Sequence, residues 1–204
     1  MSLILTQGAL PNDALGQLFS EARTYAYWQD KPVEDETLRH LYELMKFAPT
    51  SVNCSPLRIK FLRTDDAKAK LDPALSEGNR HKVHAAPVTA ILAYDRGFHR
   101  HLPELFPHAD AKSWFVGNEP YREETAFRNS SLQGGYFILA ARPWVWMPGR
   151  CRDLITTWWT GSSLLKATLI TAAIFCATWV TATAASSTLA ALGWRLSRYA
   201  SFYK

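Results

Sequence analysis

The sequence predicts a mixed α/β or α+β sandwich, built as one domain or two small ones. The chain has 204 residues, of which 48% are hydrophobic and 20% charged, which is enough for a sizeable core and excludes disorder throughout. Segments with apolar residues at helical spacing alternate with short apolar runs typical of strands. The three widely spaced cysteines exclude a disulfide scaffold, and no secretory signal is visible, so a cytoplasmic location is expected.

Two helices and a strand are predicted in the first third of the chain. Asn12 or Asp13 can cap a helix whose apolar residues recur at helical spacing over the next ten residues. A second helix begins at Glu34, where acidic residues suit the positive end of the helix dipole, and Pro49 stops it. Apolar and polar residues then alternate over 57–63, which is typical of a strand.

Further elements are predicted between residue 65 and residue 141. Residues 65–71 and 76–84 suit short helices, and the apolar run 88–94 suits a strand buried on both faces. A longer helix is predicted over 119–141. Its inward side chains are expected to be Ala126, Leu132, Tyr136, Phe137 and Leu139.

Residue types that often carry chemistry occur at a few positions, but none forms a complete motif. They are His81 with His84, His99 with His101, Glu123 with Glu124, and Cys54. The histidine pairs lack a third metal ligand nearby, so no metal site is expected. Adjacent acids in a helix usually form a solvated face, and the cysteine has no recognisable partner pattern. A structural role is therefore the favoured interpretation of each.

The composition of the chain changes near Arg142. Residues 1–142 hold 17 basic and 17 acidic side chains, whereas residues 143–204 hold six basic residues and one acid. Six of the eight tryptophans also lie in the last 62 residues. The net charge of +5 therefore comes entirely from the tail, and no nucleic-acid partner is expected from it.

Several strings in the first part of the chain resemble one known family. Among them are EART at 21–24, FAPTSVNCSP at 47–56, LFPHAD at 105–110 and ETAFRNSSLQG at 124–134. In this order they resemble the NAD(P)H nitroreductase-like flavoproteins, in particular the branch that contains malonic semialdehyde reductases of pyrimidine breakdown. The resemblance covers residues 10–142, so residues 1–142 are interpreted as a truncated FMN-binding domain.

The resemblance implies an α+β nitroreductase-like fold, with a central, mainly antiparallel sheet flanked by helices. It also implies a homodimer that holds FMN at the subunit interface and takes hydride from NADH or NADPH. Transfer is ping-pong through the flavin N5, so no catalytic side chain is expected. The implied substrate is a small aldehyde such as malonic semialdehyde, reduced to 3-hydroxypropionate, with nitroaromatics and quinones as alternatives.

The resemblance also implies which residues bind the cofactor. Arg23 and Thr24 match the positions that hold the FMN phosphate, through a guanidinium and a hydroxyl. The alternative for Arg23 is a solvated cation at a helix end. The segment that contacts the isoalloxazine ring and ribityl chain is matched by Pro49, Thr50, Ser51 and Asn53. The alternative for this segment is a plain turn without a ligand.

The resemblance stops at residue 142. The family would continue with Leu-Gly-Leu, then with the flavin loop Gly-Pro-Met-Ser-Gly-Phe-Asp, and later with the strand Phe-Leu-Cys-Asn-Leu-Gly-Tyr-Gly. None of these strings stands in residues 143–204. Because Trp and Met each have a single codon, the bases behind Trp144 to Pro148 are tightly constrained. In the shifted frame, each codon consists of the third base of one written codon and the first two bases of the next. Read in this way, the bases must encode glycine, aspartate and alanine, and they permit the string Leu-Gly-Leu-Asp-Ala-Gly.

The same shifted frame supplies the other missing strings in the right order. The codons of residues 149–156 permit Pro-Met-Ser-Gly-Phe-Asp-Asn, and those of residues 174–182 permit the missing strand. We interpret residues 143–204 as an out-of-frame tail that follows a one-base slip near residues 141–143. The C-terminal third of the fold is then expected to be disrupted, and FMN binding and activity impaired.

Two alternatives accept the tail as genuine. Residues 167–194 form a 28-residue segment without charge, long enough to span a bilayer, which would make the protein membrane-associated. Its nine alanines and six threonines make it only weakly hydrophobic. The other alternative is a non-catalytic flavin-binding protein on the same scaffold, because a fold does not fix a function.

Overall fold

A computed structural model gives the fold of the chain. It describes residues 10–22, 28, 32–75 and 77–145, together with the backbone of four strands at 154–160, 166–172, 176–181 and 200–203. The α-helices of this part are α1 (Asn12–Leu15), α2 (Asp35–Met45), α3 (Asp65–Ala69), α4 (Glu77–Ala85), α5 (Leu102–Leu105) and α6 (Glu119–Ala141). Shorter helical turns are η1 (Gly16–Ser20), η2 (Ser51–Asn53), η3 (Asp72–Ala74), η4 (Phe98–His101), η5 (Ser113–Phe115) and η6 (Arg142–Val145).

The described strands form one mixed sheet. They are β1 (Leu57–Leu62), β2 (Thr89–Tyr94), β3 (Leu154–Thr160), β4 (Lys166–Ala172), β5 (Cys176–Thr181) and β6 (Ala200–Tyr203). Their order in the sheet is β3-β4-β5-β2-β1-β6. The pairs β1–β2, β3–β4 and β4–β5 are antiparallel, whereas β2–β5 and β1–β6 are parallel. The predicted α+β class with a mainly antiparallel sheet is therefore confirmed.

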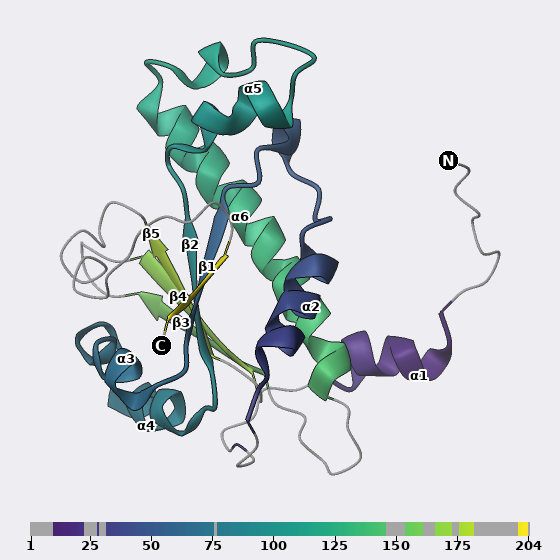
Figure 1. Cartoon of the computed structure of the whole chain (residues 1–204), viewed down its shortest axis with the longest axis vertical. Helices are drawn as coiled ribbons and strands as arrows, with labels where there is room; N and C mark the ends of the chain where they lie inside the picture. Colours follow the sequence, from purple (N-terminus) through teal and green to yellow (C-terminus); the bar gives the residue numbers. More distant parts are fainter. Residues whose placement is uncertain are drawn as a thin grey trace.

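Helices cover both faces of the β1–β2 pair. In Figure 1, α2 and α6 lie together on one side of these strands, and α3 and α4 lie on the other. Every residue of β1 and β2 is buried, as expected for strands enclosed between two layers. From α2 the core receives Leu38, Leu41 and Met45. From α6 it receives Phe137, whose ring stacks on Phe61 of β1 with centroids 6.4 Å apart.

The long helix has the predicted length but not the predicted inward face. Ala126 and Phe137 are buried as expected, whereas Leu132 is 50% exposed and Tyr136 is 40% exposed. The buried face instead carries small and polar side chains: Thr125, Asn129, Ser130, Gln133 and Gly134. Asn129 and Gln133 accept hydrogen bonds from the backbone N–H groups of Ser51 and Leu57. These bonds fix the rotation of α6, so two large apolar side chains point outward.

The start of the first helix needs correction: Pro11 holds its N-cap position without a side-chain hydrogen bond, and neither Asn12 nor Asp13 acts as its N-cap. Residues 167–194 contain β5 and nearly all of β4, so the described backbone of this segment does not fit the membrane-spanning alternative. Within the described residues, no helix is both long enough and apolar enough to cross a membrane.

Candidate functional site

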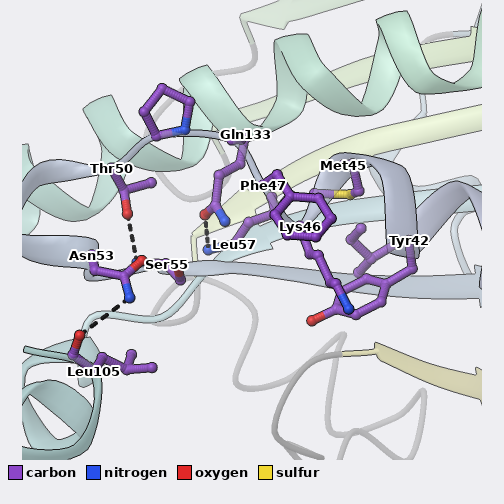
Figure 2. A pocket seen from close by; sticks show the side chains of 13 residues that line it. Tyr42, Met45, Lys46, Phe47, Thr50, Asn53, Ser55, Leu57, Leu105 and Gln133 are labelled. Carbon is purple, nitrogen blue, oxygen red and sulfur yellow. Dashed lines mark hydrogen bonds between the residues drawn. The ribbon is translucent and has the colours of Figure 1, made fainter. Parts of the chain in front are cut away.

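A cavity of about 510 Å3 opens between the end of α2 and the segment that leads into β1. We call residues 49–56 of that segment the cavity loop. Figure 2 shows polar side chains of the loop and of α6 on one side of the cavity, among them Thr50, Asn53 and Gln133. On the other side lie Tyr42 and Lys46. The volume is within the range of about 300–1,000 Å3 that is usual for small-molecule and cofactor sites.

Two amide side chains of α6 hold the cavity loop, one near its start and the other at the residue just after its end. Asn129 Oδ1 accepts a hydrogen bond from the backbone N–H of Ser51 at 2.7 Å. Gln133 Oε1 accepts one from the backbone N–H of Leu57 at 2.9 Å. Asn129 is 3% exposed and Gln133 5% exposed, and Asn129 Nδ2 also donates to the carbonyl of Thr125 at 2.8 Å.

Further hydrogen bonds hold the loop from within and from α5. The Thr50 hydroxyl accepts from the backbone N–H of Ser55 at 3.1 Å. Asn53 Nδ2 donates to the carbonyl of Leu105, at the end of α5, also at 3.1 Å. The cavity loop is thus tied to two helices that are distant in sequence, and it does not have the structure of a free turn.

The loop holds a strained backbone. Val52, Asn53 and Ser55 have φ angles of 48°, 52° and 37°, all in the left-handed region. Such a conformation costs about 1 kcal/mol or more for each non-glycine residue, most clearly for a β-branched one such as Val52. It persists only where the surrounding contacts impose it, and such positions are frequent at ligand sites.

The structure brings together part of the predicted cofactor site. Three of the predicted residues line the cavity: Pro49, Thr50 and Asn53. Ser51 contributes its backbone N–H to the contact with α6. Arg23 and Thr24 lie outside the described residues, and their role with the FMN phosphate stays a prediction.

Sequence reasoning missed three residues of this site. They are Lys46, Asn129 and Gln133. A signal for the two amides was present, because they share a helical face with Ala126 and Phe137, which were expected to point inward. Polar residues on a buried helix face need hydrogen-bond partners and so indicate a specific contact. Lys46 follows the last turn of α2 and carries no comparable signal.

Two of the other candidate residues, Glu123 and Glu124, have structural partners. Glu123 accepts a hydrogen bond from the Tyr94 hydroxyl and forms an ion pair with Arg96. Glu124 pairs with Arg128 one turn along α6. In the part of the chain that the structure describes, no three histidine, cysteine or acidic side chains gather where they could hold a metal ion.

Cys54 lies in the cavity loop but is not a nucleophile. Its side chain is 1% exposed, and burial raises the pKa of its thiol to about 12 from the ordinary value of 9.0. The hydrogen bond from Thr50 opposes this shift but does not reverse it. At neutral pH the thiol is therefore fully protonated and shielded from reagents.

This buried thiol gives the stability of the protein an alkaline pH dependence. Between pH 9.0 and about 12 the unfolded thiol loses its proton while the folded thiol keeps it, so unfolding releases a proton. We expect the free energy of unfolding to fall by up to about 1.4 kcal/mol per pH unit in this window. Urea unfolding at about pH 8 and about pH 10 measures this, with Cys54→Ala as the matched variant that lacks the slope. Equal pH dependence of both chains would contradict it.

Comparison with known proteins matches more than half of the chain to one family. The sequence model of the nitroreductase family matches residues 21–143. A Burkholderia lata protein assigned as an NADH dehydrogenase/NAD(P)H nitroreductase is 62% identical over 133 residues, which are 65% of this chain and 68% of that protein.

Solved structures share the fold. A protein from Bacillus subtilis assigned as a nitroreductase superposes with a TM-score of 0.59 at 19% identity, over 72% of this chain and 76% of that one. A nitroreductase-type protein from Exiguobacterium sibiricum, solved in complex with FMN, gives 0.57 at 17% identity, over 72% and 75% of the two chains. At such identities these likenesses show the fold alone. The family match and the Burkholderia relative show more: the chain belongs to the nitroreductase family.

Proposed function

We propose that the chain is an NAD(P)H-dependent oxidoreductase that binds FMN in the cavity beside the cavity loop. The observation that carries this proposal is the placement of Pro49, Thr50 and Asn53 around one cavity, within the stretch that the family model matches. The FMN complex of the Exiguobacterium sibiricum protein supports FMN as the cofactor. When bound, FMN supplies hydride chemistry at its N5 atom.

The lining of the cavity fits such a group. Side chains of Tyr42 and Phe47 offer aromatic and apolar surface for a planar ring system. Thr50, Asn53 and Gln133 offer polar groups toward the opposite side, where the edges of a flavin carry donors and acceptors. The residues of this chain therefore bind and orient the cofactor, and the Arg23 guanidinium is proposed to hold its phosphate.

The chain is further proposed to act as a homodimer. Along α6, the apolar side chains of Phe127 on one flank and of Leu132 and Tyr136 on the other are 40% exposed or more. Together with exposed Leu44 of α2, they leave apolar surface on the two helices that cover one side of the sheet. Contact with a second copy would remove this surface from water.

Residues 143–204 are proposed to be read out of frame, which impairs cofactor binding. The family match ends at residue 143, one residue after the predicted boundary. The match to the Burkholderia lata protein leaves about a third of each chain uncovered. We call the chain made from a gene with one base added within codons 141–143 the frame-restored chain.

The proposed substrate is a small aldehyde that carries a carboxylate, such as malonic semialdehyde. Among the described residues that line the cavity, Lys46 alone is charged. Its ammonium group lies 5.4 Å from the centre of the Phe47 ring and pairs with Glu43 outside the cavity. A single cation in a lining that is otherwise neutral favours a ligand with one anionic group.

Substrate and cofactor chemistry can be tested together by following flavin absorbance in the frame-restored chain. NADH or NADPH should bleach it, and malonic semialdehyde should restore it. We expect Lys46→Met to lower the rate at which malonic semialdehyde restores the flavin absorbance about tenfold, which is the loss expected for a hydrogen bond to a charged group. The rate of recovery with a neutral quinone should stay unchanged.

The matched control is Lys112→Met, which removes an exposed lysine that does not line the cavity. Equal slowing with both substrates would contradict the assignment of Lys46 to the carboxylate. Loss of FMN affinity instead would show that Lys46 serves the cofactor phosphate. A flavin that stays coloured with both nucleotides would indicate the flavin-binding alternative without catalysis.

A further inference from the structure

Two buried side chains one turn apart on α6 contact the cavity loop and the residue that follows it. Asn129 and Gln133 stand four residues apart, so they lie on the same face of the helix. Each offers an amide oxygen to a backbone N–H, that of Ser51 at 2.7 Å and that of Leu57 at 2.9 Å. Both side chains are buried, so water does not compete for these hydrogen bonds.

The strained residues of the loop all lie between these two anchor points. Val52, Asn53 and Ser55, with φ angles of 37° to 52°, follow Ser51 and precede Leu57. A short segment with three left-handed non-glycine residues relaxes when its ends are released. The same segment supplies Asn53 and Ser55 to the cavity, so the shape of the cavity depends on the anchors.

We propose that Asn129 and Gln133 are positioning residues that hold the cavity loop in its ligand-binding shape. They act through the backbone N–H groups of Ser51 and Leu57, at the two ends of the strained segment. This proposal rests on the proposed function, because it assigns the held loop to the flavin site. Asn129 also donates to the carbonyl of Thr125, which fixes the orientation of its amide.

The chain carries its own reporter of this anchoring. Cys54 lies between the two anchor points and is almost completely buried. When the loop opens, the thiol becomes accessible and its pKa returns toward its ordinary value, so it reacts with an alkylating reagent. The rate of Cys54 labelling therefore measures loop opening whether or not FMN is bound.

The experiment compares matched variants of the full chain and of the frame-restored chain. Gln133→Met keeps the size of the side chain and removes the acceptor, whereas Gln133→Glu keeps an acceptor oxygen. Labelling with iodoacetamide is read at Cys54 by peptide mass spectrometry, which separates it from Cys151 and Cys176 of the chain as written and from any cysteine of the recoded tail. We expect Gln133→Met and Asn129→Leu to raise the labelling rate about tenfold, the effect of one lost hydrogen bond, and Gln133→Glu to stay close to the parent chain.

A core variant separates loop opening from general loss of stability. Phe137→Leu removes the stacking on Phe61 without touching the loop anchors, and its midpoint in urea can be matched to that of Gln133→Met. Equal labelling rates in these two variants would overturn the proposal. The proposal would also be overturned if Cys54 were labelled as fast in Gln133→Glu as in Gln133→Met. A labelling rate in the folded parent chain equal to that in the urea-unfolded chain would overturn it as well.

FMN titration of the same variants distinguishes this proposal from the proposed function. We expect the dissociation constant for FMN to rise about tenfold in Gln133→Met and to recover in Gln133→Glu. If labelling changes as expected and no variant or parent binds FMN, the anchoring stands and the proposed function fails. If FMN binds and labelling does not change, the proposed function stands and the anchoring fails.

Discussion

The frame-restored chain is expected to purify with stoichiometric FMN, whereas the chain as written retains little or none. The shifted frame permits the glycine-rich flavin loop at codons 149–156 and a strand at codons 174–182. The structure places β5 (Cys176–Thr181) inside that second stretch, in parallel pairing with β2. Because β2 is buried on both faces in the middle of the sheet, the identity of its neighbour matters for stability.

The measurement is the ratio of flavin absorbance to protein absorbance after gel filtration, for both chains expressed with the same excess of riboflavin. A matched control carries three added bases at the same codons, which lengthens the chain by one residue and leaves the frame as written. Full FMN occupancy in the chain as written would contradict the proposed impairment. The nucleotide sequence of codons 139–150 then shows whether the natural gene carries the missing base.

Most of the element pattern could be predicted because it depends on local residues. The strand predicted at 57–63 is β1, the one at 88–94 is β2, and the helix at 119–141 is α6, each within a residue at either end. Apolar periodicity and flanking proline decide such elements over short distances. The rotation of α6 about its axis is different, because partners distant in sequence determine it.

Leu132 and Gln133 illustrate that difference. Apolar character alone assigned Leu132 to the core, yet it is half exposed, while its polar neighbour is buried against the start of β1. Leaving a buried backbone N–H of β1 without a hydrogen bond would cost more free energy than leaving Leu132 half exposed. The helix therefore turns its polar residue inward. Sequence periodicity contains no information about that distant N–H group.

The candidate site was predictable to a similar degree. The resemblance to a known family pointed to Pro49, Thr50 and Asn53, and these residues line the cavity. Nothing in the local sequence indicates left-handed backbone at Val52, since neither glycine nor a typical turn residue stands there. Lys46 lines the cavity together with residues of β1, α5 and α6, and this grouping depends on the tertiary fold.

A large loss of stability is expected when Arg58 of β1 is replaced by methionine. Its side chain is 7% exposed, and Nη2 lies 2.9 Å from Asp95 Oδ2, on a side chain that is 14% exposed. Nη1 donates to the carbonyl of Ser55 at 3.0 Å, at the end of the cavity loop. Arg58→Met therefore leaves a nearly buried carboxylate without its cation and a loop carbonyl without its donor. We expect the free energy of unfolding to fall by about 3 kcal/mol.

The reason for this loss can be tested by removing the second charge as well. In Arg58→Met with Asp95→Asn, no unpaired charge remains, and the asparagine oxygen can still accept from the backbone N–H of Gly97, which lies 2.7 Å from Asp95 Oδ1. The double variant should therefore regain part of the stability that Arg58→Met loses. Urea unfolding of the parent, both single variants and the double variant gives the coupling energy of the pair. Losses that simply add would show that lost packing, and not the stranded carboxylate, dominates. The loop carbonyl of Ser55 stays without its donor in either case, so faster labelling of Cys54 should persist in the double variant.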